Sequence, residues 1–476
     1  MSQVSRGLAW SSIERLLTQG LHFVFSILLA RLIAPESYGM IVIVQVFISF
    51  LMLFIDSGFS NALIQKKDRS DIDFNTVFLF NLIVSILLYI VIFACAPLIA
   101  SFFENTQITK IARVLALNLI ISSVSIVQRT RLNIKLDFKT LSKVSAVAVI
   151  LSGSIGVYLA YHGWEVWALV VQSVISQAVT TMLLLFLSKW MPRLLFSMQS
   201  FKQLFNFGSK MMFNTIITRI YLDLYNVVIG KFYSSAQLAY YNRAFTLPQL
   251  PSLAILDVIN RVAYPVECEY QNDEKKLKET YFKFLHLSCF VSLPLLAMMA
   301  VLAKPLVVVL LTEKWLESVN FLKVFAINFM VHAWLFQTNN ILAAKGYSGT
   351  LLKAMIIRRT MSFAVLMITV FISVKAICFG IAICSFFDLA VMLYFLKKIL
   401  GISFGEQLRA LANIFVTVII MAVCLAIVVN LVNDELGQLF IGVAIGILIY
   451  ICGASFFGME EINHFKKHVF VQSNNN

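Results

Sequence analysis

Charged side chains are scarce in this sequence of 476 residues. Only 13% of the residues are Asp, Glu, Lys or Arg, whereas 60% are hydrophobic, and the mean hydropathy is +0.87. A soluble domain balances apolar and polar residues far more evenly. The composition therefore excludes a soluble globular protein and predicts one that lies in a lipid bilayer.

Signatures of catalysis and of metal binding are also missing. The seven cysteines show no CxxC spacing, and the chain has no G-x-x-x-x-G-K-[ST] phosphate loop, no HExxH and no Ser-His-Asp grouping. We therefore expect no enzyme, no catalytic residues, no metal, no cofactor and no direct use of ATP. The net charge of +14 is distributed among loops between apolar runs, so it indicates membrane orientation and not a nucleic-acid partner.

Long apolar runs dominate the chain instead. A helix needs about 20 residues to cross the hydrocarbon core, and turn signals divide the sequence into about 14 runs of that length. We predict an all-α integral membrane protein with about 14 transmembrane helices. Pro248 and Pro251 are expected to break the eighth of them. The predicted cores are 8–32, 38–60, 76–100, 109–128, 142–161, 165–188, 205–230, 237–265, 282–303, 319–343, 350–373, 377–396, 409–432 and 437–457.

Lysine and arginine are concentrated in alternate loops. One set of loops begins with Lys66, Lys67 and Arg69, continues with Arg129 and Arg131, and ends with the C-terminal tail, whereas the loops between them are poorer in basic residues. Basic loops stay on the cytoplasmic side of a membrane. We therefore expect both termini in the cytoplasm. Every loop is short, so none holds an extramembrane catalytic domain.

The two halves of the sequence resemble each other. "IARVLALN" (111–118) aligns with "FLKVFAIN" (321–328), and "LLARLIAPESYGM" (28–40) aligns with "VVIGKFYSSAQLAYY" (227–241), in the same order. A repeat of six helices returns the chain to its starting side, so both copies insert in parallel, as in transporters that work by alternating access. We predict a six-helix lobe at 1–195, a second at 196–400, and two additional helices with a cytoplasmic tail at 401–476.

Ionisable side chains interrupt the predicted spans. A charge in hydrocarbon is costly, so such residues face protein or a water-filled cavity. Polar residues recur at helical spacing on the first helix of each predicted lobe, and we expect both stripes to line one shared cavity. The predicted substrate-binding cations are Arg15, Arg219, Arg243, Arg358 and Arg359. The predicted polar or ion-coupling residues are Glu14, His22, Asp56, Asp223 and His332.

Substrate binding and local pairing are both open for these residues. Arginine offers a planar, permanently charged fork that fits phosphate, so its excess favours an anionic substrate. The i,i+4 spacing of Arg219 and Asp223 also fits a structural ion pair, and we predict such a pair between Asp257 and Arg261. Asp56 aligns with Asp257 in the repeat but has no arginine one turn on. Asp56 is therefore the better candidate for coupling to H⁺ or Na⁺.

Three stretches indicate a family. They are "GLAWSSIERLLTQGLHFVFSILLARLIAPESYGM", "FIDSGFSNALIQKK" and "VVIGKFYSSAQLAYYNRAFTLPQLP". They resemble the bacterial polysaccharide exporters of the WzxC/TuaB type, in the multidrug/oligosaccharidyl-lipid/polysaccharide (MOP) flippase superfamily. The resemblance covers most of residues 1–400, and L-A-R-L-x-x-P-x-x-Y-G and Y-Y-N-R-A-F are its most specific parts.

The resemblance carries further expectations. It implies a V-shaped pair of six-helix lobes in the bacterial inner membrane, with a lumen open alternately to each side. It implies transfer of undecaprenyl-diphosphate-linked oligosaccharides to the periplasmic leaflet, with cationic lumen residues at the diphosphate-sugar head group. Membrane lipids and other polysaccharide assembly proteins are the further partners that it suggests.

The predicted function is a flippase for the lipid-linked units of O-antigen, capsule or another surface polysaccharide. Two alternatives stay open. A cation-coupled multidrug exporter of the same superfamily would favour an acidic, aromatic lumen, and a membrane glycan polymerase or ligase would need a sizeable external loop.

Overall fold

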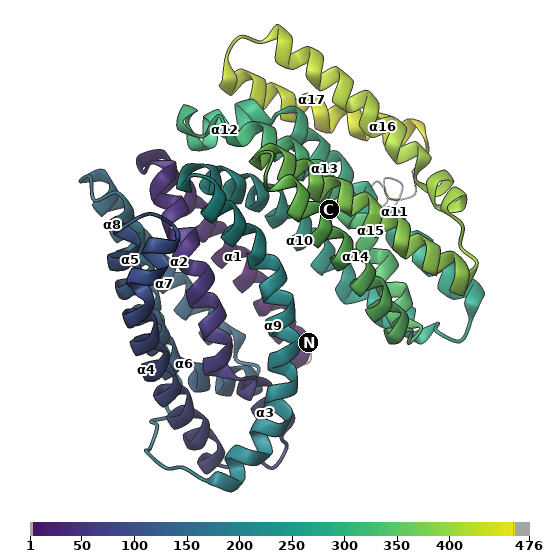
Figure 1. The fold of residues 1–476 in the computed structure, drawn as a ribbon. Coiled ribbons are helices and arrows are strands. Elements are labelled where there is room, and N and C mark those ends of the chain that lie inside the picture. The colour runs from purple at the N-terminus through teal and green to yellow at the C-terminus, as the bar shows by residue number, and fades with distance from the viewer. Residues whose placement is uncertain (1–2, 460, 462–476) are drawn as a thin grey trace, which may run out of the picture. The chain divides into compact units, whose positions relative to one another are not determined.

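The computed structural model describes residues 3–459 and Glu461, with the side chains of 18–213, 215, 216, 219–221, 223–459 and 461. These residues form α-helices, one short 3₁₀ helix and no strand. The chain separates into two compact units, Met1–Ala239 and Tyr240–Asn476 (Figure 1). The all-helical fold class is confirmed.

Helices α1 to α9 belong to the first unit. Their bounds are α1 (Gln3–Leu32), α2 (Pro35–Asp56), α3 (Phe59–Gln65), α4 (Asp71–Phe102), α5 (Gln107–Leu115), α6 (Leu117–Ile134), α7 (Phe138–Tyr161), α8 (Val166–Leu187) and α9 (Met198–Phe232).

The remaining helices form the second unit, except that α10 begins just before it. Their bounds are α10 (Ser235–Glu269), α11 (Glu274–Val301), α12 (Ala303–Leu311), the 3₁₀ helix η1 (Glu313–Trp315), α13 (Ser318–Ala344), α14 (Ser348–Thr369), α15 (Val374–Leu400), α16 (Phe404–Leu431) and α17 (Glu435–Phe456).

The six-helix repeat is visible in the order of the elements. Two residues join α1 to α2 and also α9 to α10, and three residues join α6 to α7 and also α13 to α14. In each copy the fourth span is preceded by a short helix, α5 in the first and α12 in the second. Helices α16 and α17 lie outside this pattern, pack against each other and form the yellow end of the chain (Figure 1).

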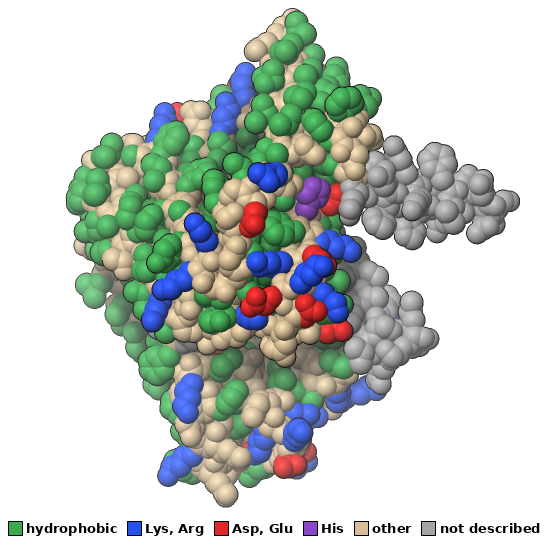
Figure 2. Space-filling view, turned by 90° about the vertical axis from the view of Figure 1, so that its right-hand side faces the viewer, with side chains coloured by type: hydrophobic (Ala, Val, Ile, Leu, Met, Phe, Trp, Pro, Cys, Tyr) green, Lys and Arg blue, Asp and Glu red, His purple; other side chains and the backbone are tan. Residues whose placement is uncertain are grey.

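Each predicted core falls mainly on helical residues, and some of them, such as 38–60 and 109–128, extend over two helices each. The helices differ in polarity. Within the described residues, ten helical segments are long and apolar enough to cross a membrane, with α2 and α3, and α5 and α6, each counted as one. Helices α1, α9, α10 and α14 are not among them, and the described part of α1 gives the shorter apolar stretch Thr18–Leu32. Helices α10 and α14 carry Arg243, Arg358 and Arg359. On the face drawn in Figure 2, hydrophobic side chains cover broad areas and the charged side chains are grouped, as in a membrane-embedded surface.

Helix α10 corrects one expectation. It runs without interruption through Pro248, Pro251 and Pro265, so the predicted break at the first two prolines is wrong. A proline removes one backbone donor and leaves a carbonyl without its intrahelical partner. Spanning helices tolerate this loss where neighbouring helices or local adjustments satisfy the freed group.

The segment between α8 and α9 is fastened to the start of α4. Arg193 donates its backbone N–H to Asn75 Oδ1 at 2.7 Å, and Ser197 donates its backbone N–H to Thr76 Oγ1 at 3.0 Å. Trp190 packs edge-on against Phe74. Helix α9 packs against α2, α3 and α4 within the first unit. The proposed boundary at 195 lies in this fastened segment, and the division into 1–195, 196–400 and 401–476 stays a prediction.

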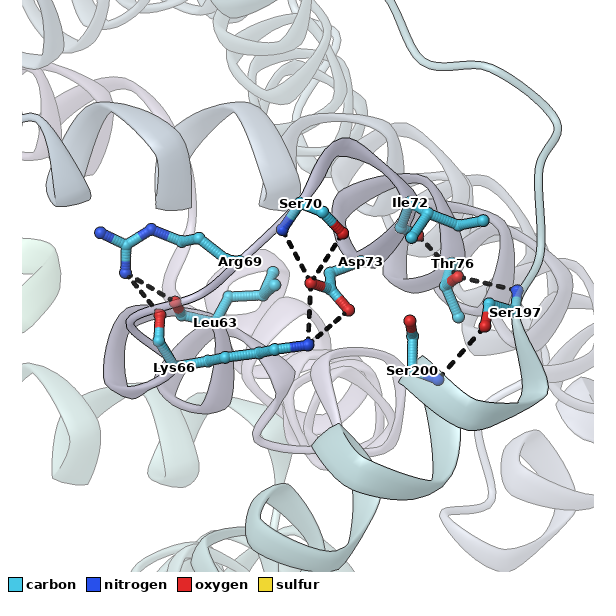
Figure 3. A network of polar contacts seen from close by, with 9 residues as sticks. All are labelled: Leu63, Lys66, Arg69, Ser70, Ile72, Asp73, Thr76, Ser197 and Ser200. Carbon is cyan, nitrogen blue, oxygen red and sulfur yellow. Dashed lines mark hydrogen bonds and ion pairs between the residues drawn. The ribbon is translucent and has the colours of Figure 1, made fainter.

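An ion-pair network closes the turn between α3 and α4 (Figure 3). The Lys66 ammonium lies 2.9 Å from both carboxylate oxygens of Asp73, whose side chain is 1% exposed. Asp73 also accepts the Ser70 backbone N–H at 2.8 Å and so caps the first turn of α4. Arg69 donates to three backbone carbonyls at the end of α3. We call Lys66, Ser70 and Asp73 the α3–α4 clasp.

Two glycines in the family-specific stretches have a structural reason. A Cβ on Gly39 would overlap the backbone carbonyl of Ser235, where the start of α10 passes α2. Gly58 has φ +73° between α2 and α3, and a Cβ there would overlap the carbonyl of Gly208 on α9. Both positions therefore need glycine, because no side chain fits between these backbones.

A buried amide fastens α16 to the other helices of the second unit. Gln407 of α16 accepts hydrogen bonds through Oε1 from the Tyr281 hydroxyl at 2.8 Å and the Trp334 indole at 2.7 Å. Tyr281 and Gln407 are fully buried. The surrounding core joins α11, α13, α15 and α16, so the appended helices share the hydrophobic core of this unit.

Candidate functional site

A polar cavity of about 470 Å³ lies within the first unit. Six helices contribute to its wall: α1, α2, α6, α7, α8 and α9. Its size falls in the range of about 300–1,000 Å³ that is typical of small-molecule sites. We call it the first-unit cavity. Its lining residues are His22, Gln45, Ile48, Ser49, Met52, Leu53, Asn118, Ser152, Gln172, Ser173, Ser176, Gln177 and Arg219.

Arg219 brings the fixed charge to this cavity. Its Nε donates to Asp223 Oδ2 at 2.6 Å, one turn along α9, and its Nη2 donates to the Ser49 hydroxyl of α2 at 2.8 Å. The Arg219 side chain remains 38% exposed, whereas that of Asp223 is 13% exposed. Asp223 therefore orients the guanidinium from the side away from the cavity. Some of the guanidinium N–H donors stay accessible from the cavity.

Neutral amides and hydroxyls form most of the polar wall. Asn118 donates through its Nδ2 to the Ser173 hydroxyl at 3.0 Å, and its Oδ1 is buried without a hydrogen-bond partner among the described residues. Gln172, Ser173, Ser176 and Gln177 follow one another along α8 at spacings of one, three and one residues. This spacing puts them on one face of the helix.

Sequence reasoning missed this neutral wall. Ionisable groups cost most in a membrane, so the predicted site rested on them and left out Gln45, Ser49 and Asn118. The stripe "QSVISQ" (172–177) on an apolar helix was the available signal. Its hydroxyl and amide groups offer both donors and acceptors to a ligand.

Two of the predicted residues lie on the wall of this cavity, one from the first helix of each repeat. They are His22 of α1 and Arg219 of α9. Glu14 and Arg15 lie on α1, but their side chains fall outside the described residues. Asp223 lies behind Arg219 as its ion-pair partner, so Arg219 is paired locally and also lines the cavity. Its role in substrate binding stays a prediction.

Asp56 occupies a capping position at the end of α2. Its Oδ1 accepts the Ser60 backbone N–H at 3.2 Å and the Ser60 hydroxyl at 2.5 Å. Ser60 in turn accepts a hydrogen bond from Thr130 at 3.1 Å. The helix breaks directly after Asp56, whereas α10 continues past Asp257, so the aligned carboxylates have different backbone settings. A role for Asp56 in ion coupling stays a prediction.

The second unit holds the other predicted cations. The Arg243 guanidinium lies 5.3 Å from the ring centroid of buried Trp315, a cation–π contact that holds η1 against α10. His332 lies between the rings of Phe329 and Phe336 on α13, at 6.0 and 6.1 Å.

Arg358 and Arg359 belong to a mixed cluster of charges. Arg358 lies near His332 of α13, and both arginines lie near Asp388 of α15. These groups come from three helices of the second unit. Substrate binding by the two arginines, and the Asp257–Arg261 pair, stay predictions.

Among the described residues, no group of three or more His, Cys, Asp or Glu side chains is placed to hold a metal ion. What the first-unit cavity offers is one guanidinium, one imidazole, four amides and four hydroxyls. Such a wall can bind an anionic group at Arg219 and many hydroxyl groups beside it.

Comparison with known proteins identifies a family. Residues 28–320 match a family described as "Polysaccharide biosynthesis protein". The chain is 25% identical over 346 residues to the teichuronic acid biosynthesis protein TuaB of Bacillus subtilis (strain 168), covering 72% of both chains. It is 24% identical over 312 residues to the lipopolysaccharide biosynthesis protein WzxC of Escherichia coli (strain K12), covering 65% of this chain and 63% of WzxC.

Solved structures share the fold. The lipid II flippase MurJ in an inward closed conformation superposes with a TM-score of 0.76 at 16% identity, covering 95% of this chain and 99% of that one. An inward-facing multidrug resistance MATE family transporter of the MOP superfamily gives 0.60 at 17% identity, covering 83% and 98%. The predicted resemblance to the WzxC/TuaB type is confirmed by these matches, and the solved structures confirm the fold. The chain belongs to the polysaccharide biosynthesis protein family.

Proposed function

We propose that this protein is a flippase that moves undecaprenyl-diphosphate-linked oligosaccharide units across the bacterial inner membrane by alternating access. The observation that carries the proposal is the composition of the first-unit cavity, with Arg219 beside neutral amides and hydroxyls. The relatives named for teichuronic acid and lipopolysaccharide biosynthesis support a glycan substrate. The lipid tail would stay in the bilayer while the head group crosses.

The cavity fits a phosphate-linked sugar in chemical terms. The Arg219 guanidinium offers charge-assisted hydrogen bonds to phosphate oxygens, and each such bond contributes roughly 1.5–3 kcal/mol. Gln172, Ser176 and Gln177 can exchange hydrogen bonds with sugar hydroxyls in place of water. A drug exporter for organic cations is less favoured, because the described lining residues include no carboxylate.

Complementation tests this function. The chain should restore surface polysaccharide in a bacterial strain from which its own polysaccharide flippase gene has been deleted, and lipid-linked units should no longer accumulate on the cytoplasmic side. A glycan polymerase would instead change polymer length without relieving that accumulation.

The orientation is proposed from the loop charges. The clasp end of the first unit carries the basic loops, which stay in the cytoplasm. Because successive spans run in opposite directions, we expect the turn between α16 and α17 in the periplasm and the C-terminus in the cytoplasm. In a chain without its native cysteines, Asn433→Cys should react with a membrane-impermeant maleimide added to intact cells, and Asn475→Cys should not. Labelling of Asn475→Cys in intact cells would contradict this orientation.

Coupling to H⁺ or Na⁺ is proposed with Asp56 as the carboxylate. Asp56→Asn should alter the dependence of transport on pH or on Na⁺, because the amide keeps an oxygen for Ser60 but cannot ionise. Asp257→Asn is the matched control at the aligned position of the repeat. Unchanged ion dependence of Asp56→Asn, at normal protein level, would remove Asp56 from the coupling mechanism.

A further inference from the structure

A second pocket, of about 540 Å³, lies at one end of the first unit. It is formed by the start of α5 and the turn between α7 and α8, and α5 packs against α8 beside it. We call it the outer pocket. Its lining residues are Gln107, Lys110, Ile111, His162, Gly163, Trp164, Glu165, Val166 and Trp167.

The outer pocket lies at the end of the helices opposite the α3–α4 clasp. Helix α4 starts at the clasp and contains 32 residues, so its far end is about 48 Å away along the helix axis. The chain reaches Gln107 shortly after that far end. The clasp end carries the basic loops that point to the cytoplasm, so the outer pocket faces the periplasm in the proposed orientation.

The polar groups of the outer pocket are available to a ligand. In the described part of the chain, no hydrogen bond or ion pair engages the side chains of Gln107, Lys110, Trp164 or Glu165. His162 is oriented, because its Nδ1 lies 2.8 Å from the Tyr158 carbonyl oxygen and must donate to it. That bond leaves Nε2 as an acceptor.

Two indole rings complete the pocket. Trp164 is 53% exposed at the turn, and Trp167 is half-buried one turn along. Glu165 between them has φ +42° and ψ −120°, a backbone conformation that L-residues rarely adopt. Flat apolar rings next to an amide, a carboxylate and an ammonium group suit a sugar ring, which has an apolar face of C–H groups and a rim of hydroxyls.

A membrane-interface belt is the simpler explanation for exposed tryptophan, and the repeat argues against it. Helix α8 begins at Val166 and α15 at Val374, so a shift of 208 residues puts Ile372, Ser373 and Lys375 at the positions of Trp164, Glu165 and Trp167. With parallel repeats both turns reach the same membrane surface, and a belt would favour Trp or Tyr at both. The second turn has neither.

We propose that the outer pocket is a binding site for a pyranose ring of an oligosaccharide on the periplasmic side. The indole of Trp164 covers the apolar face of the ring. Gln107, Glu165 and His162 hydrogen-bond its hydroxyls, and Lys110 contacts an acidic group where the sugar carries one. The choice of ligand rests on the proposed function, but the site does not depend on transport.

Direct binding to the full chain in lipid nanodiscs tests this site. The probes are two soluble sugars: chitotriose is neutral, and a hyaluronan tetrasaccharide carries uronic acids. Binding of each sugar is measured by saturation-transfer NMR. The wild-type chain should bind at least one of them saturably. Trp164→Ala should weaken binding by about twofold to tenfold, the range for loss of one ring contact. Trp164→Phe should retain most of the affinity.

Matched variants separate the site from its alternatives. Ile372→Ala, at the same turn of the second repeat, should bind as the wild type does, and Lys110→Ala should weaken only the acidic probe. A Trp164→Ala chain that fails to fold is replaced in the test by Lys110→Ala and Trp164→Phe.

Three results would overturn the proposal. They are no saturable binding of either sugar to folded wild-type protein, equal binding by wild type and Trp164→Ala, and a loss of binding in Gln177→Ala alone, which would assign the sugar to the first-unit cavity. Failed complementation with intact sugar binding would refute the proposed flippase function and leave this site standing.

Discussion

Replacing Arg219 with alanine is expected to weaken binding of the diphosphate-sugar head group by about tenfold to 150-fold, and to lower transport accordingly. The range corresponds to one charge-assisted interaction of roughly 1.5–3 kcal/mol. No other residue with a fixed charge belongs to the described wall of the first-unit cavity. Arg219→Lys should restore part of the affinity, because lysine keeps the charge but lacks the planar fork.

Asp223→Asn separates binding from folding at this site. The asparagine keeps an oxygen for the Arg219 Nε but removes the charge that offsets the guanidinium. If Arg219 binds an anion, Asp223→Asn should bind the head group at least as tightly as the wild type. If Arg219 serves only as the ion-pair partner of Asp223, both Arg219→Ala and Asp223→Asn should lose protein level together.

Arg113→Ala is the matched control for the arginine series. Arg113 also belongs to the first unit, but its Nε donates to the Phe93 carbonyl and its guanidinium lies over the Phe93 ring, away from the cavity lining. Its loss should leave head-group binding unchanged. Binding is measured with purified protein and a lipid-linked oligosaccharide, and transport is measured by complementation. Equal binding by Arg219→Ala and wild type would contradict the assignment.

Of the substitutions proposed for this protein, those that break the α3–α4 clasp should cause the largest loss of stability. Lys66→Ala leaves the Asp73 carboxylate buried without its cation, a change that costs about 3–5 kcal/mol in comparable buried pairs. We expect the midpoint of thermal unfolding in detergent to fall clearly for this variant. Lys67→Ala, which removes an exposed lysine next to it, should have little effect.

A double variant tests the cause of that loss. In Lys66→Met with Asp73→Asn, the asparagine can still accept the Ser70 N–H, and no uncompensated charge remains. Much of the stability should return. If Lys66→Ala unfolds at the same temperature as Lys67→Ala, or the double variant is no better than Lys66→Ala, the buried ion pair does not hold this turn together.

The sequence predicted the helices and the repeat because both depend on local pattern. Long apolar runs and basic loops are strong signals in a membrane chain, and each predicted core falls mainly on helical residues. The continuity of α10 was not predictable from its prolines alone, because neighbouring segments decide whether a spanning helix tolerates them.

The candidate site was only partly predictable. His22 and Arg219 stood out because ionisable groups are rare in spans, whereas Asn118 and Gln177 are neutral and cost less, so they gave a weaker signal. The contact between Arg219 and Ser49 joins residues 170 positions apart, and no local pattern contains it. The packing of α9 against α2, α3 and α4 depends likewise on long-range contacts such as the Gly58–Gly208 approach.

Translocation in proteoliposomes tests the central claim most directly. The purified chain is reconstituted with a fluorescent undecaprenyl-diphosphate oligosaccharide, and the fraction of sugar reached by an impermeant glycosidase added outside is followed in time. We predict that wild-type protein exposes the protected pool, that Arg113→Ala does so at the same rate, and that Arg219→Ala does so about tenfold to 150-fold more slowly. Wild-type protein that exposes no more sugar than protein-free liposomes, at every pH and Na⁺ gradient applied, would contradict the claim that this chain is a flippase.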